Sequence, residues 1–262
     1  MPRSLSALAA LVALAAATPA EAGPVTLRWH GQSFFEVVSP EGVRVVLDPH
    51  NIEGYGRIQV EADLVLMTHF HNDHTAAIPE VIPNIARARQ INALKKLDRD
   101  GTRQDWNVVD ETVKDVRVRT AGTYHDNMSG MKNGKNGVFI LDVGGLRVVH
   151  LGDLGHLLSR SQLRKLGKVD VLLIPVGGSY TINGLDAQKV VEQVKPTRYI
   201  IPMHYGTPVY DYLLTLDKSG FLEDQTMGTV KKYAGNELTI DPKSDPPREP
   251  VVAILHWEKR GR

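Results

Sequence analysis

The most constraining feature of this chain is the string THFHNDH, which directly follows the apolar run Leu64–Met67. An unbroken apolar run of this kind is typical of a strand buried on both faces. On an extended chain His69 and His71 project to the same side, and a turn can bring Asp73 and His74 toward the same point. The string therefore predicts a chelating group of side chains at the end of a buried strand.

Three further polar residues, His125, Asp153 and His204, each follow another strand-like run by a few positions. In open α/β sheets ligands collect at the carboxyl ends of strands, so four such ends can meet at one edge. Seven side chains would then converge: His69, His71, Asp73, His74, His125, Asp153 and His204. Seven imidazole and carboxylate ligands exceed what one tetrahedral ion needs. The pattern therefore predicts two divalent metal ions, with zinc as first choice and manganese or iron as alternatives.

The rest of the chain predicts short strands with few helices. Strands are expected at 25–29, 34–38, 43–48, 64–67, 116–119, 138–143, 146–150, 169–174, 198–201 and 251–256. The strands 138–143 and 146–150 are expected to form a hairpin with a two-residue turn at Gly144-Gly145. Helices are expected over 85–97 and around 187–194, the second ended by Pro196. With 262 residues, 42% of them hydrophobic, the chain can form one large domain.

The first 22 residues differ in kind from the others. A basic residue is followed by an uncharged, alanine-rich run and by an A-x-A pattern at Ala20–Ala22, which is typical of a secretory signal peptide. We therefore expect a signal peptide over 1–22, one folded domain over 23–262 that carries the predicted metal site, and an exported protein, periplasmic or secreted. Because the chain has no cysteine, disulfides and lipid attachment through an N-terminal cysteine are excluded, and no stable membrane anchor is expected after cleavage.

Charge gives no sign of a nucleic-acid partner. The formal net charge is +1 and the two signs are interspersed, whereas proteins that bind nucleic acid usually carry a basic face. The expected partner is a small-molecule substrate.

At the residues above, the chain resembles the metallo-β-lactamase superfamily, whose signature is the H-x-H-x-D-H string at 69–74, followed in order by His125, Asp153 and His204. The resemblance covers nearly all of residues 25–240. It implies an α/β (α+β) fold, a four-layer αβ/βα sandwich of two mixed β-sheets flanked by helices. It also implies a ligand set: His69, His71 and His125 for one metal ion, Asp73, His74 and His204 for the other, and Asp153 as the bridge.

Within that superfamily, the segments WHGQSFFEV, LGDLGH, PVGGSYT and PMHYGT look like the ascorbate-phosphate lactonase-like group of metal-dependent hydrolases. Exported β-lactamases of the superfamily place a cysteine at the second metal or lack the bridging aspartate. This chain has no cysteine and has Asp153, so antibiotic hydrolysis is not the expected activity.

The expected reaction is hydrolysis of an ester, lactone or phosphodiester by a hydroxide held between two metal ions. Asp73 is the candidate base that orients the attacking water and takes its proton. Two alternatives stay open at this point: an iron-dependent redox enzyme on the same ligands, and a metal-binding protein without turnover.

Three residues outside the proposed ligand set are assigned supporting roles. Tyr180 is a candidate substrate contact, and Asp48 and His156 are candidates for holding metal ligands in place. The Gly- and Asn-rich segment 126–137 is interpreted either as a mobile lid over the metals or as an ordinary surface hairpin.

Overall fold

The computed structural model describes residues 22–97, 104–223 and 227–257. The predicted signal peptide, apart from Ala22, lies outside these residues. In the described part of the chain, neither α-helix has the length and apolar composition needed to cross a bilayer.

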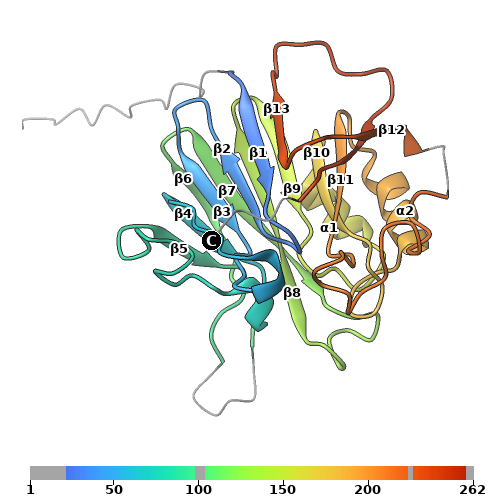
Figure 1. Ribbon diagram of the computed structural model, residues 1–262, viewed down its shortest axis with the longest axis horizontal. Helices are drawn as coiled ribbons and strands as arrows, with labels where there is room; N and C mark the ends of the chain where they lie inside the picture. The colour runs from blue at the N-terminus through green and yellow to red at the C-terminus, as the bar shows by residue number, and fades with distance from the viewer. Residues whose placement is uncertain (1–21, 98–103, 224–226, 258–262) are drawn as a thin grey trace, which may run out of the picture.

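Two sheets form the framework (Figure 1). The six-stranded sheet has the order β13 (Glu237–Ile240), β1 (Val25–Trp29), β2 (Phe35–Val38), β3 (Arg44–Leu47), β4 (Leu64–Met67), β5 (Arg89–Asn92). The eight-stranded sheet has the order β12 (Thr229–Lys232), β14 (Val251–Ile254), β11 (Tyr199–Met203), β10 (Val171–Pro175), β9 (Leu146–His150), β8 (Lys135–Val143), β7 (Val116–Tyr124), β6 (Asp110–Val113).

Both sheets are mixed. In the first, β13, β1, β2 and β3 pair antiparallel, while β3, β4 and β5 pair parallel. In the second, β6 to β9 pair antiparallel, while β9, β10, β11, β14 and β12 pair parallel. The two mixed sheets expected from the resemblance are therefore present.

The core follows from the alternation of side chains along the strands. On β4, Leu64 and Leu66 join the large apolar cluster that both sheets share, whereas Val65 and Met67 join a smaller cluster on the opposite face. All four side chains are buried, so β4 is covered on both faces, as its apolar run predicts. The histidine string thus begins at the end of a rigid, central strand.

Turn and cap residues fix the connections of the second sheet. Gly144 and Gly145 both have positive φ and join Val143 to Leu146, which confirms the predicted two-residue hairpin. Helix α1 (Arg160–Leu166) begins at a capping box on Ser159, and α2 (Gly184–Val194) begins at Asn183, whose side chain accepts a bond from the amide of Asp186. Figure 1 shows both helices beside the β10–β11 part of the second sheet.

The helix predicted over 85–97 is wrong. Turns run up to residue 87, and Arg89–Asn92 instead forms β5, paired parallel with β4 from Leu64↔Arg89 to Met67↔Asn92. Ile85 packs in the smaller cluster and Ile91 in the larger one, so the segment serves both faces of the sheet. Pairing with an open strand edge has overridden local helix propensity. The outer face of the first sheet is accordingly covered, in the described residues, by turns and 3₁₀ segments instead of an α-helix.

Strand direction brings four carboxyl ends together. Because β7 and β9 both pair antiparallel with β8, they run in the same direction, and β11 runs parallel to them through β10. His125, Asp153 and His204 follow these three strands, and the histidine string follows β4 of the other sheet. The sandwich thus collects its polar residues along one edge.

Candidate metal centre

The Asp153 carboxylate lies at the middle of the converging side chains. Its Oδ2 atom is 3.0 Å from Nε2 of His204 and 3.1 Å from Nε2 of His125. The Nε2 atoms of His74 and His69 lie 3.3 and 3.8 Å from the same oxygen. One buried carboxylate therefore contacts imidazoles that come from all the other ligand segments.

The seven predicted ligands form two groups of compatible geometry. His69, His71 and His125 share one group with Asp153, and Asp73, His74 and His204 form the other. This division matches the one expected from the family resemblance. A third group joins Asp48 to His69 and His74.

Local backbone structure explains how the string reaches both groups. After His71 in extended conformation, the chain forms a 3₁₀ turn over Asn72–His74. The turn sends His74 inward, where it is fully buried, and leaves Asp73 partly exposed at the mouth of the site.

Burial and neighbouring charges shift the pKa values of several site residues in opposite directions. Burial alone raises the pKa of the Asp153 carboxyl, but His204 and His74 hold that pKa well below its usual range. Burial lowers the pKa of the His74 imidazole, but Asp153 and Asp48 together raise that pKa well above its usual value. The pKa of His69 is lowered well below its usual value by burial, with repulsion from His74 adding to the effect. Dense, buried, mutually dependent charges of this kind are typical of functional sites.

Two atoms test whether a cation fits. The Nε2 atom of His74 and the Oδ1 atom of Asp153 are buried, and neither has a hydrogen-bond partner among the described residues. Buried polar atoms without partners are costly, and both atom types are good ligands for divalent zinc, manganese or iron. The residues present therefore fit a metal cluster.

Asp48 holds two of the histidines in place. Its carboxylate accepts bonds from the Thr68 amide and hydroxyl, both at 2.7 Å, and lies 2.8 Å from Nδ1 of His74. Because the Thr68 hydroxyl donates to Asp48, it is free to accept a bond from Nδ1 of His69, 2.9 Å away. In this arrangement both imidazoles keep their Nε2 lone pairs for the cluster. The predicted supporting role of Asp48 agrees with these contacts.

Gln32 is a site residue that the sequence reasoning missed. Its side chain is fully buried, and Nε2 donates to Oδ2 of Asp73 at 3.1 Å. Its backbone oxygen accepts from the indole of Trp29 and from the amide of His204. Gln32 has φ of 49°, as Asp48 has 44° and His204 has 53°. Non-glycine residues in this left-handed region are uncommon and concentrate at functional sites.

Asn136 is a second residue that was missed. It is fully buried, its Oδ1 accepts the Asp153 amide at 3.0 Å, and its Nδ2 donates to the Thr123 hydroxyl and to the Leu151 carbonyl. Asn136 thereby ties the ends of β7, β8 and β9 together beneath Asp153. The only sequence signal was its place in an Asn- and Gly-rich segment, which indicates a turn rather than a buried bridge.

His156 does not reach the cluster. Its Nε2 accepts the backbone amide of Tyr124 at 3.0 Å, and its Nδ1 lies 2.7 Å from the Leu157 carbonyl. It therefore supports the end of β7, one residue before His125, and acts on the site only through the backbone.

A cavity of about 470 Å³ opens above the cluster. Among its lining residues are Asp73 and Asp153 from the cluster, and Tyr180, Tyr210 and Leu213 from loops that surround it. Burial, with the nearby charge of Asp73 adding to it, raises the pKa of the Tyr210 phenol to about 12. The predicted substrate contact Tyr180 thus lies at the cavity wall, with its side chain more than half exposed.

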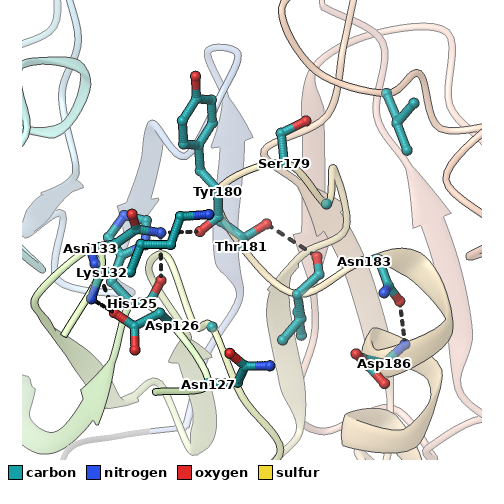
Figure 2. Close-up of a pocket in the computed structure, with 14 residues that line it drawn as sticks. His125, Asp126, Asn127, Lys132, Asn133, Ser179, Tyr180, Thr181, Asn183 and Asp186 are labelled. Atoms are coloured by element: carbon teal, nitrogen blue, oxygen red, sulfur yellow. Dashed lines mark hydrogen bonds between the residues drawn. The ribbon is translucent and has the colours of Figure 1, made fainter. Parts of the chain in front are cut away.

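The segment after His125 forms the wall of a second cavity, shown in Figure 2. The Asp126 carboxylate accepts backbone N–H bonds from Met128, Gly130, Lys132 and Asn133. Asn133 in turn donates to the carbonyls of His125 and Tyr180. These bonds hold the segment to its own first residue, as expected for an ordered connection between β7 and β8. A lid role for 126–137 stays a prediction.

Comparison with known proteins places these observations in a family. The profile of the Beta-lactamase superfamily domain matches residues 26–204. A UPF0173 metal-dependent hydrolase from Thermococcus onnurineus is 28% identical over 194 residues, covering 70% of this chain and 85% of that protein. A UPF0173 protein from Pyrococcus furiosus is 33% identical over 185 residues, covering 68% and 82%.

A solved structure from Thermotoga maritima, described as a Zn-dependent hydrolase of the metallo-β-lactamase superfamily, shares 31% identity. It superposes with a TM-score of 0.62 and covers 88% of this chain and 100% of that one. The predicted fold is thereby confirmed. The match is to the superfamily, and the narrower likeness to the ascorbate-phosphate lactonase-like group stays a prediction.

Proposed function

This chain belongs to the β-lactamase superfamily and is a metal-dependent hydrolase, and we propose that it holds two divalent ions at the cluster around Asp153. The observation that carries the proposal is the pair of buried atoms without a hydrogen bond, Nε2 of His74 and Oδ1 of Asp153, among seven ligand-type side chains. Buried atoms of this kind are few in a hydrogen-bonded core, and both of these are of ligand type.

The ligands divide as their geometry suggests. His69, His71 and His125 would hold one ion, Asp73, His74 and His204 the other, and Asp153 would bridge them. Zinc is the first candidate, with manganese or iron as alternatives. When bound, the two ions supply a nucleophile from water near neutral pH and stabilise negative charge that develops on the substrate.

The remaining chemistry belongs to the protein. Asp73 is the proposed base: its Oδ2 accepts the Gln32 amide, which fixes the carboxylate, and its side chain is 29% exposed toward the cavity, where it can take a proton from water. Asp48 and Thr68 hold His69 and His74 in the orientation that binding needs. The buried strand ends around them exclude bulk water and keep these contacts strong.

The proposed substrate is a small molecule with an ester, lactone or phosphodiester bond. A cavity of about 470 Å³ is in the ordinary range for small-molecule sites. Bound ions would supply both the nucleophile and the charge stabilisation, so the proposed reaction needs no serine or cysteine nucleophile, and the chain has no cysteine.

Metal analysis combined with a substrate panel tests this function. We expect about two divalent ions per chain in a fully active preparation, and turnover of at least one chromogenic ester, lactone or phosphodiester that chelation abolishes. One tightly held ion with no second site on titration contradicts the dinuclear centre. Iron with redox turnover, or two ions without any turnover, favours one of the two alternatives.

We also propose that the protein is exported after cleavage near Ala22. This rests on the sequence of residues 1–22 alone. The intact mass of the exported protein should correspond to a chain that begins directly after Ala22. A mass that corresponds to a chain beginning at Met1 contradicts the proposal.

A further inference from the structure

The cavity in Figure 2 adjoins the candidate metal centre. It has a volume of about 380 Å³ and is bounded by the 126–133 segment on one side and by residues 178–183 on the other. His125 and Tyr180 line both this cavity and the one above the cluster. The two cavities therefore adjoin at these two residues, and Lys132 lines the one that lies farther from the cluster. We call this space the lateral cavity.

Three charged side chains line the lateral cavity, Asp126, Lys132 and Asp186, and their contacts differ. Both carboxylates are already satisfied: Asp126 by four backbone N–H groups, and Asp186 by the Lys189 ammonium at 2.9 Å. The Lys132 ammonium forms no ion pair or hydrogen bond with any of the described residues. The Lys132 ammonium is therefore the charged group of the lateral cavity that remains available to bind a ligand, while the two carboxylates keep their negative charge.

Lys132 is also held in position. Its backbone amide donates to Oδ2 of Asp126 at 2.9 Å, and the next residue, Asn133, is bonded to the carbonyls of His125 and Tyr180. Figure 2 shows the Lys132 side chain extending from this anchored segment toward Tyr180. Because the backbone is fixed, a ligand that binds this ammonium group has to order only the lysine side chain.

Other side chains that line the lateral cavity can also donate hydrogen bonds to an anion. Asn127 and Ser179 line the same cavity, and both offer short polar side chains. The wall nearer the cluster is different, since Tyr180, Tyr210 and Tyr212 line it with aromatic rings. The two cavities together therefore suit a molecule with an apolar part near the reactive bond and a charged oxygen group at its other end.

We propose that the substrate is an anionic small molecule whose carboxylate or phosphate group binds Lys132 in the lateral cavity while its scissile bond lies at the cluster. This rests on the proposed hydrolase function and names the class of molecule that this function acts on. Lys132 is a specificity residue in this scheme, because it contacts the substrate away from the bond that breaks.

The kinetic test uses the metal-loaded protein and three matched esters of 4-nitrophenol. The first is a succinate ester with its free carboxylate, the second is the same compound as its neutral methyl ester, and the third has a phosphonate in place of the carboxylate. Lys132→Met should raise KM for the anionic esters about tenfold, the usual effect of losing one hydrogen bond to a charged group, and should leave KM for the neutral ester unchanged. Lys132→Arg should keep most of the affinity.

Lys168→Met is the matched control, since Lys168 is also exposed but lies outside both cavities. It should change none of the three KM values. A larger effect of Lys132→Met on the phosphonate than on the carboxylate identifies the phosphate class, and the reverse identifies the carboxylate class. An equal change for the charged and neutral esters, or no change for any of them, overturns the proposal.

A binding measurement separates this inference from the proposed function. By titration calorimetry on the metal-loaded protein, glutarate should bind about tenfold more weakly to Lys132→Met than to the parent, at equal metal content, while neutral glutaramide should show no difference. If no ester is hydrolysed but glutarate binding depends on Lys132, the function fails and the anion subsite stands. If esters are hydrolysed and glutarate binding is the same in both proteins, the subsite fails and the function stands.

Discussion

Replacement of Asp48 by asparagine should weaken metal binding without removing any metal ligand. The wild-type carboxylate accepts all three of its bonds, from the Thr68 amide, the Thr68 hydroxyl and His74. An asparagine at 48 offers one acceptor oxygen and one NH₂ group with two N–H donors. In place of Oδ1 the NH₂ group faces the Thr68 backbone N–H, and in place of Oδ2 it faces both the Thr68 hydroxyl and the Nδ1–H of His74. Asparagine tolerates the positive φ of this position, so backbone strain is not the cause of the effect.

The magnitude follows from the bond that is lost. A hydrogen bond to a charged group contributes about 1.5–3 kcal/mol. If His74 instead accepts from the new amide, its proton moves to Nε2 and blocks the atom that faces Asp153 and Asp73. Since about 1.4 kcal/mol is a factor of ten, the affinity for the ion near His74 should fall roughly 10- to 100-fold. The free energy of unfolding should fall by about 1–3 kcal/mol through the weakened buried network.

Competition with a zinc-binding dye measures the affinity, and urea unfolding measures the stability. The matched control is Asp115→Asn, because Asp115 is also a buried carboxylate and accepts the Ser39 hydroxyl and the Glu41 amide far from the cluster. Asp115→Asn should lose stability to a similar extent and keep parental metal affinity. Parental affinity in a folded Asp48→Asn protein, or an equal loss of affinity in both variants, would refute the role assigned to Asp48.

Two further predictions concern single side chains. Asp73→Asn should lower kcat by roughly two to four orders of magnitude if Asp73 moves the proton, and hydrolysis at the parental rate with both metals bound would exclude it as the base. Burial lowers the pKa of His50 to about 3, below the 6.5 of an unperturbed histidine. As the pH falls, the His50 imidazole therefore binds a proton in the unfolded chain before it does so in the folded protein. The contribution of neutral, buried His50 to the free energy of unfolding is complete above about pH 6.5, and it is lost at roughly 1.4 kcal/mol per pH unit as the pH falls toward 3. Between pH 6.5 and pH 5, the free energy of unfolding measured with urea should fall by about 2 kcal/mol less for His50→Gln than for the parent protein. An identical pH dependence in both proteins would contradict this assignment.

The sequence predicted the candidate site better than the elements that surround it. The seven ligand-type residues follow strand-like runs, and strand direction alone brings them to one edge, so their meeting required no knowledge of side-chain contacts. Gln32 and Asn136 were missed because their roles depend on bonds to Asp73 and Asp153 across long stretches of chain, and on a positive φ at Gln32. Neither property leaves a local pattern.

The strands show the same division between local and long-range causes. Val25–Trp29 and Leu64–Met67 were predicted with the bounds that the structure has, because the apolar pattern of each run directly indicates a buried strand. Arg89–Asn92 was misinterpreted as helix because its strand conformation depends on the free edge of β4. The exposed strand Thr229–Lys232 has no apolar alternation and exists through its pairing with β14.

The convergence of four strand ends has a kinetic consequence. Residues 69–74 leave the ribosome long before His204, and the second ligand group needs both. Such distant pairings form late in folding, after the cost of closing a long loop has been met. A nascent or truncated chain that ends before β11 therefore lacks the complete centre, and binding of the proposed second ion would report that β11 has taken its place in the second sheet. The time course of metal uptake would therefore measure the rate of the last folding step of this protein.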